Sequence, residues 1–140
     1  MFISNKILFV LVLAGLLLTA CGGSKATEVK ITLNEFGIES STTDFQKGVA
    51  YHFVVANEGT VEHEMMIMPP VIPDSMGMTM DMGEMDKLSL VMIEASDLPA
   101  GATASFDYTF TESAPDGSFE FACHTPGHYE AGMKLPITVK

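Results

Sequence analysis

The chain has 140 residues, with 18 acidic and 7 basic side chains and a formal net charge of −11 at neutral pH. This length predicts a single domain, and the acidic balance excludes a nucleic-acid-binding protein, which needs a basic surface. Two interpretations of the charge stay open. It steers a basic partner protein toward this one, or it keeps the protein soluble, which the scattered distribution of the charges favours.

Residues 1–20 have the pattern of a signal peptide. Lys6 precedes a continuous apolar run from Ile7 to Leu18. The run is too short to span a bilayer core of about 30 Å comfortably, and it is typical of a signal-peptide h-region. We therefore predict that the protein is exported.

The apolar run ends in Leu18-Thr19-Ala20-Cys21. This segment resembles the lipobox of bacterial lipoproteins, in which the cysteine is lipidated and becomes the first residue of the mature protein. The alternative is an ordinary signal peptide, or an uncleaved anchor, with a chance cysteine. We predict lipidation of Cys21, a tether over residues 21–27 that is rich in small residues, and attachment to a membrane of the cell envelope on its periplasmic or extracellular side.

Residues 28–140 have the pattern of one all-β domain. Short alternating or apolar runs are separated by turns rich in Gly, Pro, Asn and Asp, which is typical of an antiparallel sandwich or barrel. No helical period of useful length is present. The predicted strands cover residues 28–34, 51–56, 61–68, 88–93, 102–110, 118–122 and 135–139.

Residues 71–87 interrupt the strand pattern and are predicted to be a methionine-rich insertion. Methionine occurs at alternate positions from Met76 to Met82 and again at Met85. In an extended chain the first four side chains would share one face. The pattern leaves open whether the segment is a low-complexity loop or a single helical turn.

Three potential metal ligands stand five residues apart near the carboxyl end, Cys123, His128 and Met133. A thiolate, an imidazole and a thioether together favour copper, since zinc sites seldom recruit a thioether. If Cys21 carries lipid, Cys123 has no disulfide partner, and metal ligation explains an unpaired thiol in an exported protein. With His63 from another strand, we predict a trigonal site of His63, Cys123 and His128 with Met133 as a long axial ligand.

The chain resembles the cupredoxins, the small blue-copper proteins such as azurin, plastocyanin and auracyanin. The resemblance rests on Asn57-x-Gly59-x-x-x-His63 followed by Cys123-x4-His128-x4-Met133, and it covers about residues 28–140. It implies a Greek-key sandwich of about eight strands, one type 1 copper, the four ligands named above, and electron passage through the exposed edge of His128.

Three nearby residues lie outside this ligand set. Many cupredoxins carry asparagine after the first histidine, where it ties down the cysteine loop. This chain has Glu64 in that place, so the resemblance does not predict that bond. His124 follows the cysteine, and we expect it to point away from the copper as a surface residue. His52 is predicted to be a solvated strand residue.

Two functions follow from these residues. The first is a monomeric electron carrier, not an enzyme, that docks an unidentified redox partner through an apolar rim with Met66, Pro126 and Pro136 as candidates. The second is copper binding for tolerance or delivery. The second reading would use the methionine run for Cu(I), since thioethers prefer that ion, although such a run also suits an adaptable apolar loop. Its candidate secondary Cu(I) ligands are Met76, Met78, Met80, Met82 and Met85.

Overall fold

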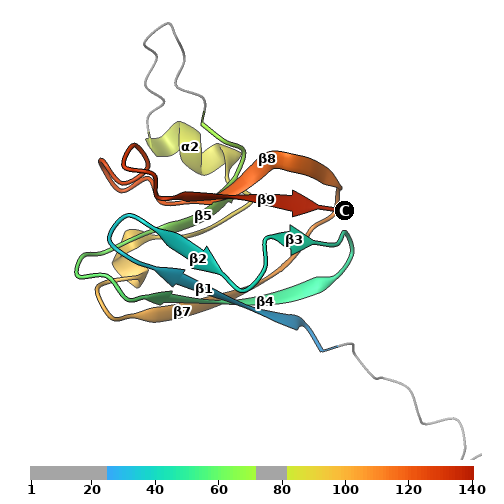
Figure 1. Ribbon diagram of the computed structural model, residues 1–140, viewed down its shortest axis with the longest axis horizontal. Helices are drawn as coiled ribbons and strands as arrows, with labels where there is room; N and C mark the ends of the chain where they lie inside the picture. Colours follow the sequence, from blue (N-terminus) through green and yellow to red (C-terminus); the bar gives the residue numbers. More distant parts are fainter. Residues whose placement is uncertain (1–24, 72–81) are drawn as a thin grey trace, which may run out of the picture.

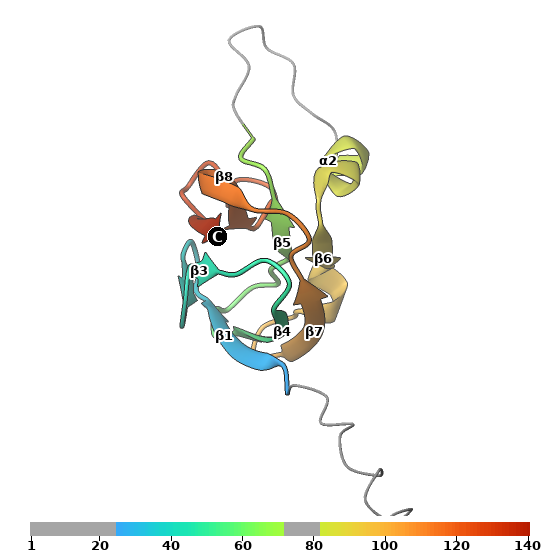
Figure 2. The ribbon, with the colours of Figure 1, turned by 90° about the vertical axis from the view of Figure 1, so that its right-hand side faces the viewer.

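The computed structural model describes residues 25–71 and 82–140. Within these ranges it contains two β-sheets that pack face to face, together with one short α-helix and the 3₁₀ helix η1 (Ala95–Asp97) (Figures 1 and 2). The all-β sandwich predicted from the sequence is confirmed. The predicted signal peptide, Cys21 and Met76, Met78 and Met80 lie outside the described residues, as does the side chain of Met82.

The four-stranded sheet has the order β2-β1-β4-β7. Its strands are β1 (Thr27–Leu33), β2 (Ile38–Ser40), β4 (Ala50–Asn57) and β7 (Thr103–Thr109). Strands β1 and β4 run parallel, while the other two pairs are antiparallel. From Tyr51 to Asn57, strand β4 alternates between buried and half-buried positions, so one face of this sheet supplies half of the core.

The five-stranded sheet has the order β3-β9-β8-β5-β6. Its strands are β3 (Asp44–Phe45), β5 (Met65–Met68), β6 (Val91–Ile93), β8 (Ala114–Ala122) and β9 (Lys134–Val139). Strand β5 is buried at all four positions, because its inner side chains enter the core and its outer ones are covered as well. The cover lies on the side of α2 (Met82–Leu88), which Figure 2 shows outside β5 and β6.

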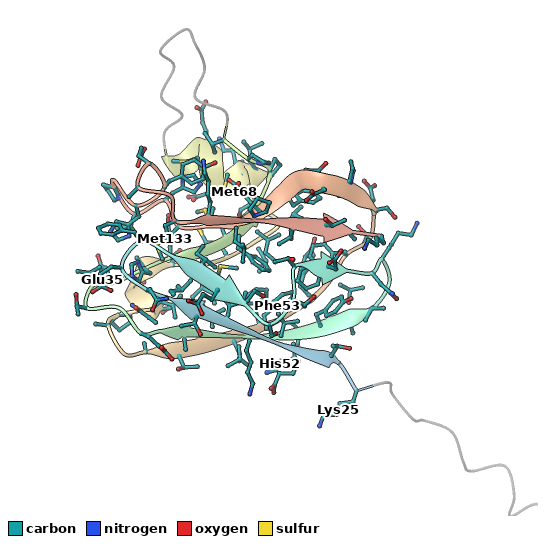
Figure 3. The ribbon with its side chains drawn as sticks, in the orientation of Figure 1. Lys25, Glu35, His52, Phe53, Met68 and Met133 are labelled. Atoms are coloured by element: carbon teal, nitrogen blue, oxygen red, sulfur yellow. The ribbon has the colours of Figure 1, made fainter. Side chains whose placement is uncertain are left out.

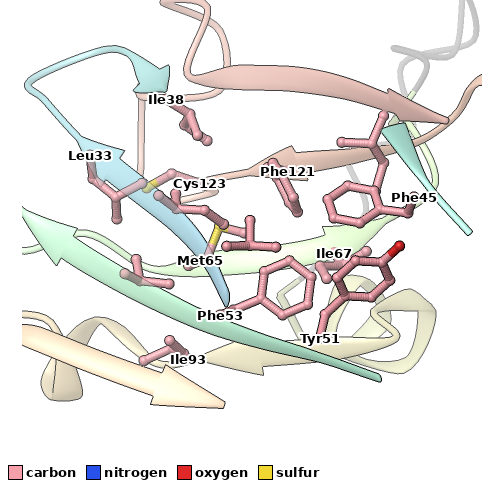
Figure 4. Packing of buried hydrophobic residues seen from close by; sticks show 14 of the residues in the cluster. Leu33, Ile38, Phe45, Tyr51, Phe53, Met65, Ile67, Ile93, Phe121 and Cys123 are labelled. Carbon is pink, nitrogen blue, oxygen red and sulfur yellow. The ribbon is translucent and has the colours of Figure 1, made fainter. Parts of the chain in front are cut away.

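The core between the sheets is built from aromatic and aliphatic side chains. Phe45 contacts Tyr51, Phe53, Phe110 and Phe121 with ring centroids 5.0 to 5.9 Å apart, in the tilted and edge-on geometries that aromatic pairs prefer. Figure 4 shows Phe45 and Tyr51 toward one end of the core and Cys123 toward the other, with Phe53 and Phe121 between them. The metal-ligand candidates therefore lie at the end of the sandwich away from the aromatic cluster.

The structure differs from the sequence prediction at several elements. Strands β2 and β3 were not predicted, because three and two residues are too few to establish a period. The strand expected over 61–68 begins at Met65, and the one expected over 88–93 begins at Val91, because α2 ends at Leu88. The strand expected over 118–122 begins at Ala114, and Gly117, with φ 76°, lies at an irregularity inside β8 where the register with β9 shifts. Glycine tolerates that conformation.

Candidate metal centre

The loop that carries His63 is organised by the buried Asn57 side chain. Its amide nitrogen donates to the carbonyl oxygens of Val61 at 2.8 Å and Leu98 at 2.9 Å, and its amide oxygen accepts from the Gly59 N–H at 2.9 Å. The His63 N–H in turn donates to Leu98 O at 3.2 Å. The three hydrogen bonds of the Asn57 side chain therefore hold the backbone of this loop in the conformation that directs His63 into the interior.

Gly59 is required at its position by a close approach. A Cβ placed there would lie 2.8 Å from His63 Nε2, 2.8 Å from Glu35 Oε2 and 3.2 Å from Asn57 Oδ1. Glu35 accepts from the N–H and the hydroxyl of Thr60 at 3.0 and 2.6 Å, which holds its carboxylate beside the loop. In the Asn57-x-Gly59 pattern, Asn57 therefore fixes the loop, and Gly59 leaves room for the Nε2 side of the His63 ring.

A second loop supplies the remaining ligand candidates from the end of β8. Cys123 N donates to Met133 O at 3.1 Å, Met133 N donates to His128 O at 3.0 Å, and His128 N donates to Thr125 O at 2.9 Å. Gly127 and Gly132 take φ of 85° and 105°, a region that favours glycine. These bonds return the chain twice, so that Cys123, His128 and Met133 come from one closed loop.

Three donor atoms converge where the two loops meet. His63 Nδ1 lies 3.1 Å from His128 Nδ1 and 3.9 Å from Cys123 Sγ, and Cys123 Sγ lies 3.7 Å from His128 Nδ1. A triangle with these sides has a circumscribed circle of radius about 2.1 Å, close to protein metal–nitrogen and metal–sulfur bonds of about 2.0 to 2.3 Å. One metal ion therefore fits between the three atoms without movement of the backbone.

Burial prepares these donors for a metal. His63 and Cys123 are fully buried, and desolvation, together with the neighbouring His128, lowers the pKa of His63. The lowered pKa keeps the imidazole neutral, which is the form that binds metal. His63, Cys123 and His128 form a group able to hold a metal ion within the described part of the chain.

Met133 is fully buried in the same core as Cys123, and Figure 3 shows it at the end of the sandwich where Glu35 also lies. The set of two imidazoles, one thiolate and one thioether is that of a type 1 copper site. The thioether of Met133 as axial ligand stays a prediction.

Glu64 holds the cysteine loop through a hydrogen bond that the sequence alone did not predict. Its Oε1 accepts a hydrogen bond of 2.6 Å from the backbone N–H of His124, and both residues are buried. Glu64 therefore ties the cysteine loop to the strand that follows His63. Desolvation raises the pKa of this carboxyl despite that bond, and the charge of Asp86 raises it further.

The expectation that His124 is a surface residue is wrong. Its ring is buried and stacks on Tyr129 with centroids 4.3 Å apart, while burial lowers its pKa. Tyr129 donates to Glu120 Oε1 at 2.6 Å. This burial could not be predicted from the sequence, because the side chain that covers His124 is that of Tyr129, five residues further along a folded loop.

His128 is the ligand candidate that reaches the surface. It is half-buried, and the exposed ring of Phe36 meets its ring edge-on at 5.5 Å. Pro126 and Pro136 are exposed, as expected for a rim, whereas Met66 is fully buried and was wrongly placed there. Sequence reasoning missed Phe36, which carries no ligand chemistry.

Other predicted residues lie away from this centre. His52 is half-exposed on β4, and its Nδ1 lies 2.7 Å from Asp107 Oδ1, in agreement with a solvated strand position (Figure 3). Met85 lies on α2, packed against the outer face of the five-stranded sheet. None of the helices within residues 25–71 and 82–140 combines the length and apolar character that a membrane span requires.

Comparison with solved structures places this geometry among known folds. Auracyanin of Roseiflexus castenholzii, reduced with dithionite, aligns with a TM-score of 0.58 and 18% identity over 84% of this chain and 99% of its own. Auracyanin A of Chloroflexus aurantiacus, a "blue" copper protein, aligns at 0.57 and 15% identity over 83% and 100%. The fold is that of the cupredoxins. Auracyanin B gives a TM-score of 0.56 at 18% identity over 82% of this chain and 89% of its own.

Comparison by sequence adds a relative of this cupredoxin-fold chain. The chain is 32% identical over 102 residues to the copper-resistant cuproprotein CopI of Rubrivivax gelatinosus. That match covers 73% of this chain but 59% of CopI, so the chain spans less than two thirds of its relative. No family model matches the chain. The fold and the donor set together identify the centre as a site for one type 1 copper.

Proposed function

We propose that this protein carries single electrons between redox partners through one type 1 copper. The observation that carries the proposal is the buried triangle of His63 Nδ1, Cys123 Sγ and His128 Nδ1, whose third member alone is part-exposed. Copper held there would supply one-electron chemistry by cycling between Cu(I) and Cu(II).

The residues around the triangle suit that role. Buried His63 and Cys123 keep water from two of the donors, and the loop bonds between Cys123, His128 and Met133 hold their backbones in place. Donors held in this way need little rearrangement when the charge of the ion changes. Within the described residues, His63, Cys123 and His128 form a group of side chains able to hold a metal, and one copper at that site is enough for single-electron transfer.

Electron exchange is proposed to occur at the His128 edge. Phe36 is 56% exposed there, and Pro126 is exposed in the same loop as His128. A small apolar rim of this kind suits transient docking, and redox encounters typically bury less than about 1,200 Å². The partner would bring its own redox group against this rim, and the acidic charge of the chain would attract a basic partner.

The visible spectrum tests the proposal. Cu(II) added to the metal-free protein should produce an intense thiolate charge-transfer band, and the bound copper should give reversible one-electron voltammetry. Cys123→Ser should abolish the band, while His52→Gln, at a histidine on the outer side of β4, should retain it. A colourless complex, or a band that survives Cys123→Ser, would exclude the type 1 site.

Copper tolerance is a second candidate function, favoured by the similarity to CopI, which is named for copper resistance. Deletion of the gene should then increase the copper sensitivity of the host. Complementation with the unaltered gene should restore growth, and complementation with Cys123→Ser should not. Unchanged growth on copper after deletion would leave electron transfer as the function.

We also propose that the protein is exported and held at a membrane of the cell envelope by lipid on Cys21, on the strength of the apolar run that precedes this residue. Radiolabelled palmitate should label the wild-type protein and not Cys21→Ser. Label in the variant, or a wild-type protein found entirely in the soluble fraction, would argue against the anchor.

A further inference from the structure

The outer face of the five-stranded sheet carries a cluster that is separate from the core between the sheets. Its members, which we call the outer methionine cluster, come from β5 and the segment after it, from β6, β8 and α2, and from the loop after β8. The buried members are Met66, Met68, Met85, Ala122 and Tyr129, and Val71 and Met92 pack against them half-buried. Figure 3 shows Met68 on the side of the sheet where α2 lies.

The register of the strands brings thioethers side by side. Met66 stands directly opposite Met92 on β6 and opposite Ala122 on β8. Directly opposed residues have Cβ atoms about 5 Å apart, so Met66 and Met92 are neighbours on the outer face. Met85 reaches the same cluster from α2.

The composition of this cluster differs from that of the inner core. The inner core uses valine, leucine, isoleucine and aromatic residues at most positions, whereas each buried aliphatic side chain larger than alanine in the outer cluster is methionine. Methionine fills irregular gaps, yet a gap-filling role does not by itself require thioethers on three separate elements. Thioethers are soft ligands that select Cu(I).

An independent observation comes from His124. The residue is 8% exposed, and its Nε2 is buried without a hydrogen-bond partner in the described part of the chain. Its ring stacks at 4.3 Å on Tyr129, a member of the outer cluster. Buried polar atoms are nearly always paired. An unpaired imidazole nitrogen on a ring that stacks on a member of the methionine cluster therefore points to a ligand that the imidazole and the thioethers would share.

We propose that Met66, Met68, Met85 and His124 bind a second metal ion, Cu(I), on the outer face of the sheet, with Met92 beside them. Neutral thioether and imidazole donors suit a soft monovalent ion better than a divalent one. The buried carboxyls of Glu64 and Glu120 flank the site, since Glu64 accepts from the His124 N–H and Glu120 from Tyr129. Their negative charge would offset that of the ion.

This site is distinct from the type 1 centre, because neighbouring residues of one strand point to opposite faces of a sheet. Cys123 belongs to the inner core, while Ala122 belongs to the outer cluster. Met65 and Ile67 are likewise inner residues, and Met66 and Met68 are outer ones. The two ions would lie on opposite sides of β5 and β8.

The test is the Cu(I) stoichiometry of the full-length protein under anaerobic conditions, measured by competition with the chromophoric chelator bicinchoninate. A background in which Met76, Met78, Met80 and Met82 are all leucine removes the methionine run from the measurement. In this background we expect two Cu(I) per chain, and one after Met66→Leu and Met68→Leu are added. Met65→Leu, on the same strand but the inner face, should leave two.

Folding and site assignment are checked in the same samples. Met-to-Leu exchange conserves volume, and an unchanged Cu(II) charge-transfer band would show that the variants fold and keep the type 1 site. The second Cu(I) equivalent should shift the His124 imidazole nitrogen resonances in ¹⁵N spectra. One Cu(I) in the background, two after Met66→Leu and Met68→Leu, or a His124 signal that does not shift would each overturn the proposal. Because the charge-transfer band reports only the type 1 site, its loss is distinguishable from failure of the outer site.

Discussion

The two faces of β5 and β8 use neighbouring residues for different purposes. On the inner face, His63 and Cys123 converge within 3.9 Å at the end of a dense core. On the outer face, Glu64 and His124 join through a 2.6 Å hydrogen bond beside methionines that α2 helps to cover. These residues lie just before β5 and just after β8. One residue of displacement there separates a ligand from a supporting residue, because the side-chain period of the adjoining strands is two.

The inner face depends most on Asn57, and its replacement should have the largest effect. Asn57→Ala removes two bonds to the carbonyl oxygens of Val61 and Leu98 and one from the Gly59 N–H. Loss of these partners should lower the free energy of unfolding by about 3 kcal/mol, at about 1 kcal/mol for each bond. Urea denaturation of the metal-free protein measures it. Asn34→Ala is the control, because the Asn34 side chain makes no hydrogen bond in the described part of the chain, and it should lower the free energy of unfolding far less. Equal losses in the two variants would contradict the role of Asn57.

The outer face depends on Glu64. Glu64→Ala leaves the buried His124 N–H without its acceptor and should cost about 2 kcal/mol of unfolding free energy. Glu64→Gln keeps an acceptor oxygen and should cost much less in urea denaturation. A similar loss in both would show that the charge, and not the hydrogen bond, holds the cysteine loop.

The same carboxyl predicts a pH dependence. Because burial raises the pKa of Glu64 in the folded protein, the folded state binds its proton more readily than the unfolded state. Its contribution to stability is therefore fully present below the unfolded pKa and is lost as pH rises through the folded pKa. The stability of Glu64→Gln relative to wild type should increase as pH rises from acid toward neutral. A difference in unfolding free energy between Glu64→Gln and wild type that stays constant across that range would mean that folding does not raise the pKa of Glu64.

Gly59 tests how closely the inner face is packed behind its ligand. Gly59→Ala places a Cβ 2.8 Å from His63 Nε2, so the ring must shift and its Nδ1 leaves its place in the donor triangle. Copper affinity, measured by chelator competition, should fall about tenfold, which corresponds to about 1.4 kcal/mol. Gly37→Ala is the matched control, since nothing lies within 4 Å of its added Cβ. Equal affinities of the two variants would refute the close approach.

Tyr129 sharpens the comparison from the outer side with the smallest effect. Tyr129→Phe keeps the stack on His124 but removes the hydroxyl that donates to Glu120 and accepts from the Val71 N–H at 3.2 Å. The loss should be about 1 kcal/mol in thermal or urea unfolding. Tyr108→Phe, whose hydroxyl makes no hydrogen bond described here, should be close to neutral. A larger effect at Tyr108 than at Tyr129 would contradict this account.

Much of the site could be predicted from residue types and spacing. The sequence Cys123-x4-His128-x4-Met133 with His63 upstream specifies soft and imidazole donors. In the structure, the donor atoms of His63, Cys123 and His128 do come together. The alternation of residues 102–110 likewise predicted β7 closely. Short elements such as β3 could not be predicted from a local period. Strand β3 is defined by its pairing with β9, which lies far along the chain.

Residue types and spacing alone show which atoms are available to bind a metal and which residues of each strand share a face. Which of those faces are covered, and by what, is seen only in the folded chain. Met66 looked like a rim residue and is buried, His124 looked exposed and is buried, and Glu64 found its partner sixty residues away. The physical reason is that a period of two separates the faces of a strand, whereas burial depends on α2 and on loops that reach the sheet from distant parts of the chain.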